Sequence, residues 1–159
     1  MAKVGYIGLG IMGASIVRNL IKAGHELVVH NRSQKIVQEL VSAGATAAPS
    51  PKEVAQQVEF VFTNLPDSPD VEKVVLGANG IIEGAHTGLI FIDNSTIKPE
   101  TARELAAKLE AAGVMALDAP VSGGDVGAKN GTLTIMVGGP QAAFDKAVPL
   151  FQAMGKAWV

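Results

Sequence analysis

Six residues near the N-terminus have types and a spacing suited to holding a phosphate. An expected strand, Lys3–Ile7, runs directly into a loop with the pattern G-x-G-x-x-G, made of Gly8, Leu9, Gly10, Ile11, Met12 and Gly13. In such a loop the first glycine permits a tight turn, the second removes the Cβ that would block a phosphate, and the third lets helix and strand pack closely. The helix that follows directs its positive dipole end and free N–H groups at the anion. The pattern therefore predicts binding of a dinucleotide pyrophosphate, although in a chain with 18 glycines a purely structural turn is the alternative.

The segment after the second expected strand indicates which dinucleotide binds. His30-Asn31-Arg32-Ser33 stands where a site for NAD usually presents Asp or Glu to the ribose hydroxyls. Asn31 can hydrogen-bond a 2′-phosphate, and Arg32 can pair with it and stack on the adenine. Ser33 is also the expected N-cap of the next helix. These residues favour NADP, with NAD possible because Asn31 also suits an unphosphorylated ribose. The alternative is that Arg32 is a solvated surface charge.

Two more segments are expected beside the cofactor, because ligands of a parallel α/β sheet lie at the carboxyl ends of its strands. The segment after the fourth expected strand contains Leu65 and Pro66, which we expect on the adenosine or pyrophosphate side. The segment after the fifth contains Ser95 and Thr96, which we expect near the nicotinamide ribose or carboxamide. Residues of these types also serve ordinary turns and helix caps, so that interpretation stays open.

A glycine-rich loop after the sixth expected strand is placed at the same edge. It begins at Asp118, and Pro120 follows the strand. Ser122, together with the backbone N–H groups of Gly123 and Gly124, can form a concave set of donors for a carboxylate. The same residues could equally form a flexible hairpin connection. Substrate binding by this loop is therefore a hypothesis.

The elements that must position these residues follow a repeated order of helix, Ala-Gly and strand. Glycine is favoured just past a helix C-terminus, and the pairs here are Ala23-Gly24, Ala43-Gly44 and Ala112-Gly113. Helix starts are expected at Ser50-Pro51, at Ser68-Pro69 and at Pro99. The first helix is expected over residues 11–23, and the strands over 3–7, 26–30, 45–48, 60–63, 89–92 and 114–118. Strands that alternate with helices predict an α/β fold of the Rossmann type, a doubly wound, mainly parallel sheet with helices on both faces.

The last third of the chain has a different pattern. Thr132–Val137 alternates between apolar and polar residues and predicts an antiparallel or edge strand after the glycine-rich loop. A helix near 141–153 and a final strand, Ala157–Val159, are expected after it. The sequence contains no repeat or linker, so residues 1–159 are predicted to form one domain.

Composition narrows the function further. The net charge of −2 and the absence of an apolar run long enough to span a bilayer argue against nucleic acid and membrane partners. The chain has no cysteine, which excludes disulfides and thiol chemistry, and we predict no metal site. The N-terminus enters a strand directly, as expected of a cytoplasmic protein. Hydrophobic residues make up 48% of the chain, which either reflects buried parallel strands or predicts apolar surface covered by something outside the chain.

Taken together, these motifs resemble the β-hydroxyacid dehydrogenase family. The family includes 3-hydroxyisobutyrate dehydrogenase and tartronate semialdehyde reductase, with 6-phosphogluconate dehydrogenase more distant. The resemblance rests on the glycine loop, Asn31-Arg32, Leu65-Pro66 and the run from Asp118 through Gly139, and it covers essentially the whole chain. It implies hydride transfer between a nicotinamide cofactor and a small β-hydroxy acid or semialdehyde. The Ser122–Gly124 loop would then bind the substrate.

Members of that family also carry an acid/base lysine in a Gly-x-x-x-Lys-x-x-Asn pattern beyond the Rossmann domain, followed by an all-helical C-terminal domain that mediates dimerisation. The sequence ends at Val159 without such a pattern, so the resemblance implies a fragment that lacks this domain, with a homo-oligomer expected only at full length. Loss of the helical domain would also explain the apolar composition. We expect the chain to bind NADP(H) with little or no turnover. The alternatives are a non-catalytic NADP-binding scaffold or sensor, and an enzyme acting on an imine or another short-chain semialdehyde.

Overall fold

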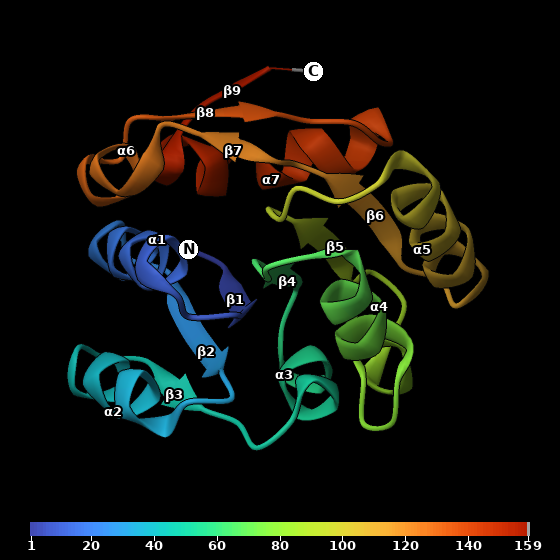
Figure 1. Ribbon diagram of the computed structural model, residues 1–159, viewed down its shortest axis with the longest axis horizontal. Helices are drawn as coiled ribbons and strands as arrows, with labels where there is room; N and C mark the ends of the chain where they lie inside the picture. Colours follow the sequence, from blue (N-terminus) through green and yellow to red (C-terminus); the bar gives the residue numbers. More distant parts are fainter. Residues whose placement is uncertain (159) are drawn as a thin grey trace.

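A six-stranded parallel sheet forms the centre of the computed structural model, which describes residues 1–158 (Figure 1). The strand order is β3-β2-β1-β4-β5-β6, and every neighbouring pair is parallel. The central strands are buried on both faces, as the continuous apolar runs predict. The strands are β1 (Lys3–Ile7), β2 (Glu26–His30), β3 (Thr46–Ala47), β4 (Phe60–Thr63), β5 (Ile90–Asp93) and β6 (Met115–Asp118).

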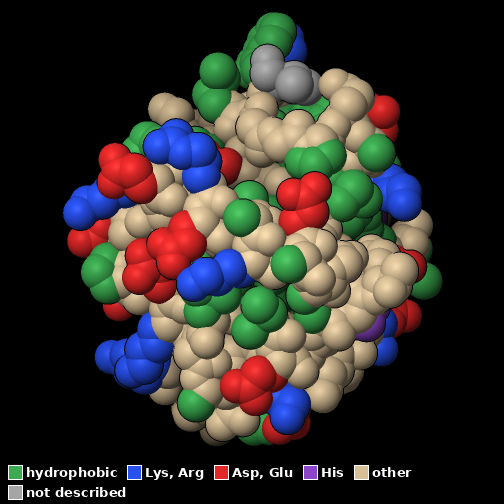
Figure 2. Space-filling model, turned by 90° about the vertical axis from the view of Figure 1, so that its right-hand side faces the viewer, with side chains coloured by type: hydrophobic (Ala, Val, Ile, Leu, Met, Phe, Trp, Pro, Cys, Tyr) green, Lys and Arg blue, Asp and Glu red, His purple; other side chains and the backbone are tan. Residues whose placement is uncertain are grey.

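Helices cover both faces of this sheet, which confirms the predicted doubly wound α/β fold. One face packs against α1 (Ile11–Lys22), α2 (Gln34–Ser42), α6 (Gly124–Asn130) and α7 (Gln141–Met154). The other face packs against α3 (Pro51–Gln57), α4 (Ser68–Leu76), the 3₁₀ helix η1 (Ile81–Gly84) and α5 (Pro99–Ala111). Figure 2 presents the side of the molecule that carries α5, where exposed hydrophobic side chains lie between charged ones. Among the helices of residues 1–158, none is long and apolar enough to cross a membrane.

Most helix ends agree with the expected signals. Gly24, Gly44 and Gly113 all have positive φ (+95°, +116° and +84°), which is the backbone conformation that favours glycine after a helix. The Ser50 hydroxyl accepts a hydrogen bond from the Glu53 N–H at 3.2 Å and caps α3. The expected cap at Ser68 is wrong by one residue.

Asp67 is the residue that caps α4, and its carboxylate accepts the Ser68 N–H at 2.7 Å. The Ser68 side chain is buried and accepts the Lys98 N–H at 3.0 Å, so this serine joins α4 to the segment before α5. A tertiary contact of this kind gives no local signal in the sequence.

The last third of the chain forms a second, three-stranded sheet in the order β7-β8-β9. The strands are β7 (Val121–Ser122), β8 (Leu133–Met136) and β9 (Gly155–Trp158). Thr132–Val137 was predicted to be an antiparallel or edge strand. The antiparallel pairing is confirmed, because β8 runs antiparallel to β7, but β8 is the central strand of this sheet and is parallel to β9. A single antiparallel bridge between Asp118 and Gly138 links this sheet to β6. Of the expected final strand, Val159 lies outside the described residues.

The sequence predicts a loop for the glycine-rich segment after Ser122. In the structure most of this segment forms the short helix α6 (Gly124–Asn130). Asn19 of α1 donates to the Ala128 carbonyl at 2.7 Å, and Ala128 is buried. Gly131 ends the helix with a φ of +68°. Packing against α1 therefore supplies the stability that the glycine-rich sequence lacks.

Candidate dinucleotide site

The strand order reverses between β1 and β4, and the glycine loop lies at this switch point. Gly8 has a φ of +98°, and a Cβ there would overlap the Asn64 carbonyl. A Cβ at Gly13 would overlap the Gly8 carbonyl and press on the Tyr6 ring, because α1 packs closely on β1. A Cβ at Gly10 would meet no atom within 4 Å. Gly8 and Gly13 are thus required by the protein itself, whereas Gly10 leaves open space at the start of α1.

The N-terminus of α1 faces that open space without a side-chain cap or an acidic residue in its first turn. Its first backbone N–H groups have no acceptor within the helix. Such an end attracts an anion through its free donors and its dipole. The geometry of the glycine loop therefore suits a pyrophosphate group.

Asn31 has a role in the protein that the sequence did not reveal. Its side-chain oxygen accepts the Leu9 N–H at 3.0 Å, and its amide nitrogen donates to the Ser33 carbonyl at 3.2 Å. It therefore holds the glycine loop against the end of β2. Arg32 is exposed, and no ion pair involves it among residues 1–158. Ser33 occupies the N-cap position of α2, but its side chain makes no capping hydrogen bond.

Two adjoining hollows surround the glycine loop. The larger, of about 920 Å³, runs along the loop and α1, and is lined among others by Gly8–Ser15, Arg18, Asn31, Ser33, Ile36 and Asp125. The smaller, of about 380 Å³, is lined among others by His30, Asn31, Arg32, Asp70, Lys73 and Val74. Gly8, Asn31, Leu65 and Pro66 border both hollows, which together form one elongated cleft.

The loops after β4 and β5 are held together by side chains. The Ser95 hydroxyl accepts the Leu65 N–H at 2.8 Å, and Asp93 accepts both the Thr63 hydroxyl at 2.8 Å and the Ser95 N–H at 3.0 Å. Ser95 is 2% exposed and lines neither hollow, so it supports Leu65 rather than facing the cleft as expected. Thr96 is exposed but also lines neither hollow.

A second buried network ties the glycine loop to the loop that begins at Ser122. The Tyr6 hydroxyl donates to the Asn94 side-chain oxygen at 2.9 Å, and the Asn94 amide donates to the Ala119 carbonyl at 2.9 Å. Burial raises the pKa of the Tyr6 phenol well above its ordinary value, so it remains a hydrogen-bond donor at neutral pH. Tyr6 precedes Gly8 by two residues, and Ala119 precedes Ser122 by three. The network therefore fixes the spacing between the two loops.

Ser122, Gly123 and Gly124 lie together where β7 meets α6. Ser122 is exposed, and both glycines have positive φ (+133° and +63°). Asp125, the next residue, lines the larger hollow, so the segment that begins at Ser122 runs directly to the cleft. The packing of α6 on α1 brings this about.

Sequence reasoning did not identify Arg18, Ile36, Lys73 or Asp125 as lining residues of the cleft. Asp125 directly follows Ser122–Gly124, and this position in the sequence was the one signal that could have pointed to it. The other three lie on helices, where the side that faces the cleft depends on tertiary packing. Residues 1–158 contain no group of three or more His, Asp or Glu side chains placed to hold a metal.

Two characterised relatives are similar over almost the whole chain. The chain is 42% identical to 2-hydroxy-3-oxopropionate reductase of Escherichia coli over 97% of its length, which is 52% of that protein. It is 45% identical to the NAD-dependent L-serine dehydrogenase of Pseudomonas aeruginosa over 98% of its length, again 52% of that protein. The chain therefore spans about half the length of these relatives.

Solved structures agree with this similarity. Mycobacterium tuberculosis 3-hydroxyisobutyrate dehydrogenase with L-serine matches 99% of the chain and 54% of its own, with a TM-score of 0.93 and 33% identity. Psf3 in complex with NADP+ and 2-OPP matches 97% of the chain and 55% of its own, with a TM-score of 0.92 and 33% identity. The family described as the NAD binding domain of 6-phosphogluconate dehydrogenase matches residues 3–159. The chain therefore belongs to this family of nicotinamide-cofactor-binding Rossmann domains.

Proposed function

We propose that residues 1–159 form one NADP(H)-binding domain of an oxidoreductase that transfers hydride between the nicotinamide and a small β-hydroxy acid or semialdehyde. The observation that carries this proposal is the open space over Gly10 at the uncapped start of α1. This space lies in a cleft that runs from Arg32 to Asp125, which is next to the substrate loop. The similarity to reductases and dehydrogenases of small hydroxy acids supports the same reaction.

Each part of the cleft would bind a different part of the cofactor. The pyrophosphate would lie over Gly10, with Leu9, Ile11 and Met12 around it, and Leu65 and Pro66 would border the adenosine half. Arg32 would pair with a 2′-phosphate, which favours NADP because a guanidinium forms strong, charge-assisted bonds to phosphate. Bound there, the nicotinamide cofactor supplies or accepts the hydride.

The substrate would be held by the Ser122–Gly124 loop, through the serine hydroxyl and the backbone N–H groups. A side chain positioned to donate or accept a proton at the reacting group raises the rate of such reactions by about 10²–10⁴-fold. Lys129, the lysine nearest this loop in sequence, is exposed on α6. We therefore expect residues 1–159 alone to bind the cofactor with little turnover. Turnover of a small semialdehyde at ordinary dehydrogenase rates by this chain would reject that expectation.

Titration with NADPH and NADH tests the cofactor assignment. Loss of a charge-assisted hydrogen bond costs about 1.5–3 kcal/mol, so Arg32→Ala is expected to weaken NADPH binding by about 10- to 150-fold. NADH binding should change little. Lys22→Ala, which removes an exposed cation at the far end of α1, is the matched control. Equal affinities for both cofactors, unchanged by Arg32→Ala, would reject the preference for NADP.

A further inference from the structure

The smaller hollow of the dinucleotide cleft contains two charged side chains that the proposed function does not use. Asp70 and Lys73 both line it, and both belong to α4. They are three residues apart, so they lie on the same face of the helix, together with Val74. No ion pair within residues 1–158 joins the carboxylate to the ammonium group. One wall of the hollow therefore presents an acceptor and a donor next to each other.

The other polar side chains of the hollow already have a partner or a proposed role. The His30 Nδ1 donates to the backbone carbonyl of the residue that follows β3, at 3.0 Å. The Asn31 side chain holds the glycine loop, and Arg32 is assigned to the 2′-phosphate. Asp70 and Lys73 are thus left to contact whatever else the hollow binds.

The rest of the hollow defines what kind of group fits against α4. Its lining is mainly apolar and includes Pro51, Leu65, Pro66 and Val74. Apolar walls with a few polar groups suit a flat aromatic ring, whose edge can then reach those groups. A phosphate does not suit this wall, because the Asp70 carboxylate would repel it. The α4 side of the hollow therefore fits a neutral ring with a donor and an acceptor on one edge.

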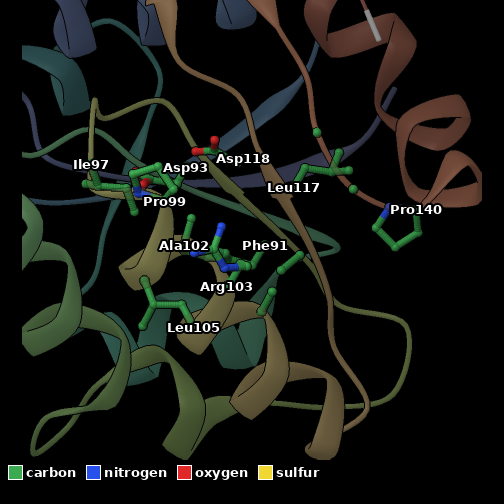
Figure 3. A pocket seen from close by; sticks show the side chains of 14 residues that line it. Phe91, Asp93, Ile97, Pro99, Ala102, Arg103, Leu105, Leu117, Asp118 and Pro140 are labelled. Atoms are coloured by element: carbon green, nitrogen blue, oxygen red, sulfur yellow. The ribbon is translucent and has the colours of Figure 1, made fainter.

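The structure has another mostly apolar pocket, but it is not a place for the base of the same cofactor. Figure 3 shows this pocket, of about 320 Å³, with Asp93 and Asp118 together at one end and Arg103 of α5 below them. It lies against β5 and β6 and shares no lining residue with the cleft. A base joined to a pyrophosphate over Gly10 therefore belongs in the smaller hollow, which adjoins the glycine loop.

Adenine has an edge of the required kind. Its N6 amino group donates, and a ring nitrogen beside it accepts. We propose that Asp70 and Lys73 recognise the base of the cofactor, with Asp70 accepting the N6–H of adenine and the Lys73 ammonium group donating to the neighbouring ring nitrogen. The two residues would then select an adenine dinucleotide over one with another purine. This inference rests on the proposed function, because it takes the pyrophosphate to lie over Gly10.

The deamino analogue of NADPH, in which hypoxanthine replaces adenine, is the probe. It keeps both riboses, all the phosphates and the nicotinamide, but a carbonyl oxygen takes the place of the N6 amino group. The Asp70 carboxylate would face that oxygen, so two acceptors would oppose each other. In calorimetric titrations of the chain we expect NADPH to bind at least about tenfold more tightly than the analogue, because a hydrogen bond to a charged group is lost.

Two variants assign this discrimination to α4. Asp70→Asn offers both a donor and an acceptor, so it can bond either base, and the preference for NADPH over its deamino analogue should fall below about threefold. Lys73→Ala should weaken NADPH and NADH binding by a similar factor, about tenfold, because both carry adenine. A loss confined to NADPH would instead place Lys73 at the 2′-phosphate and overturn its role at the base.

Glu72→Gln is the matched control, because it makes the same charge change on α4 away from the hollow. Its carboxylate accepts the Thr101 hydroxyl at 3.4 Å, on the side of α5, and the variant should keep the wild-type preference for NADPH over the analogue. The wild-type comparison does not depend on whether any variant folds. If the chain binds NADPH and its deamino analogue equally tightly, the dinucleotide site stands and only the recognition of the base is refuted. If it binds neither NADPH nor NADH, the proposed function fails and this inference fails with it.

Discussion

Replacing Asp93 by asparagine should change how the stability of the protein depends on pH. In the folded protein, burial is the main cause that raises the Asp93 pKa from 3.8 to about 6. The folded state therefore keeps this proton to a higher pH than the unfolded chain does. Between about pH 4 and pH 6 the folded state binds more protons than the unfolded state, so the free energy of unfolding falls as the pH rises.

The size of the effect follows from the same pKa values. One pKa unit corresponds to about 1.4 kcal/mol, so ionisation of Asp93 should lower the free energy of unfolding by about 3 kcal/mol once the pH exceeds 7. The amide introduced by Asp93→Asn cannot ionise, and its side-chain oxygen can still accept from Thr63 and Ser95. The variant should therefore lose most of the pH-dependent decline. Asp118, whose pKa burial also raises, accounts for a remaining slope in both proteins.

Urea unfolding followed by circular dichroism at several pH values between 4 and 7.5 measures this difference. The difference in free energy of unfolding between Asp93→Asn and the wild type should grow by about 2–3 kcal/mol across the range. Glu110→Gln, on the exposed side of α5, is the matched control and should follow the wild type. Parallel curves for the wild type and Asp93→Asn would show that Asp93 is not a destabilised buried carboxylate, and the reasoning would fail.

Three further predictions concern the glycine loop and its supports. Gly13→Ala should destabilise the fold by about 1–3 kcal/mol in urea unfolding, since its Cβ would overlap backbone, whereas Gly10→Ala should leave stability unchanged and weaken NADPH binding at least tenfold. Unaltered NADPH binding by Gly10→Ala would contradict the placement of the pyrophosphate. Tyr6→Phe should cost about 1–3 kcal/mol of stability, because Asn94 loses its buried donor; a change below about 0.5 kcal/mol would mean that the bond contributes little. Asn31→Ala should weaken NADPH and NADH binding alike in titrations, because it releases the Leu9 N–H that holds the loop; a selective loss of NADPH would instead indicate direct phosphate contact.

Much of the fold could be predicted because its signals are local. The Ala-Gly pairs mark where glycine must adopt positive φ, and the apolar runs mark strands buried on two faces. The errors occur where tertiary contacts override such signals. The Ser68 hydroxyl turns to Lys98 instead of capping α4, and α6 forms from a glycine-rich segment because α1 supports it.

The residues of the candidate site also fall into those with a local sequence signal and those whose role depends on a distant partner. The glycine loop could be predicted from residue type and spacing, because pyrophosphate binding requires a fixed backbone path over consecutive residues. Arg32 borders the smaller hollow, and its contact with a 2′-phosphate stays a prediction. The supporting role of Ser95 and the second role of Asn31 could not be predicted, since each depends on a partner 30 or 22 residues away.

The sequence by itself therefore determined the class of fold and the position of the dinucleotide site, since both depend on short-range patterns. Only the tertiary structure decided which polar side chains face the cleft and which hold it together. It also brought Asp93 and Asp118, which lie on different strands, into register beside an apolar pocket. The physical reason is that burial and hydrogen-bond partners arise when strands align in a sheet, and no local pattern encodes that alignment.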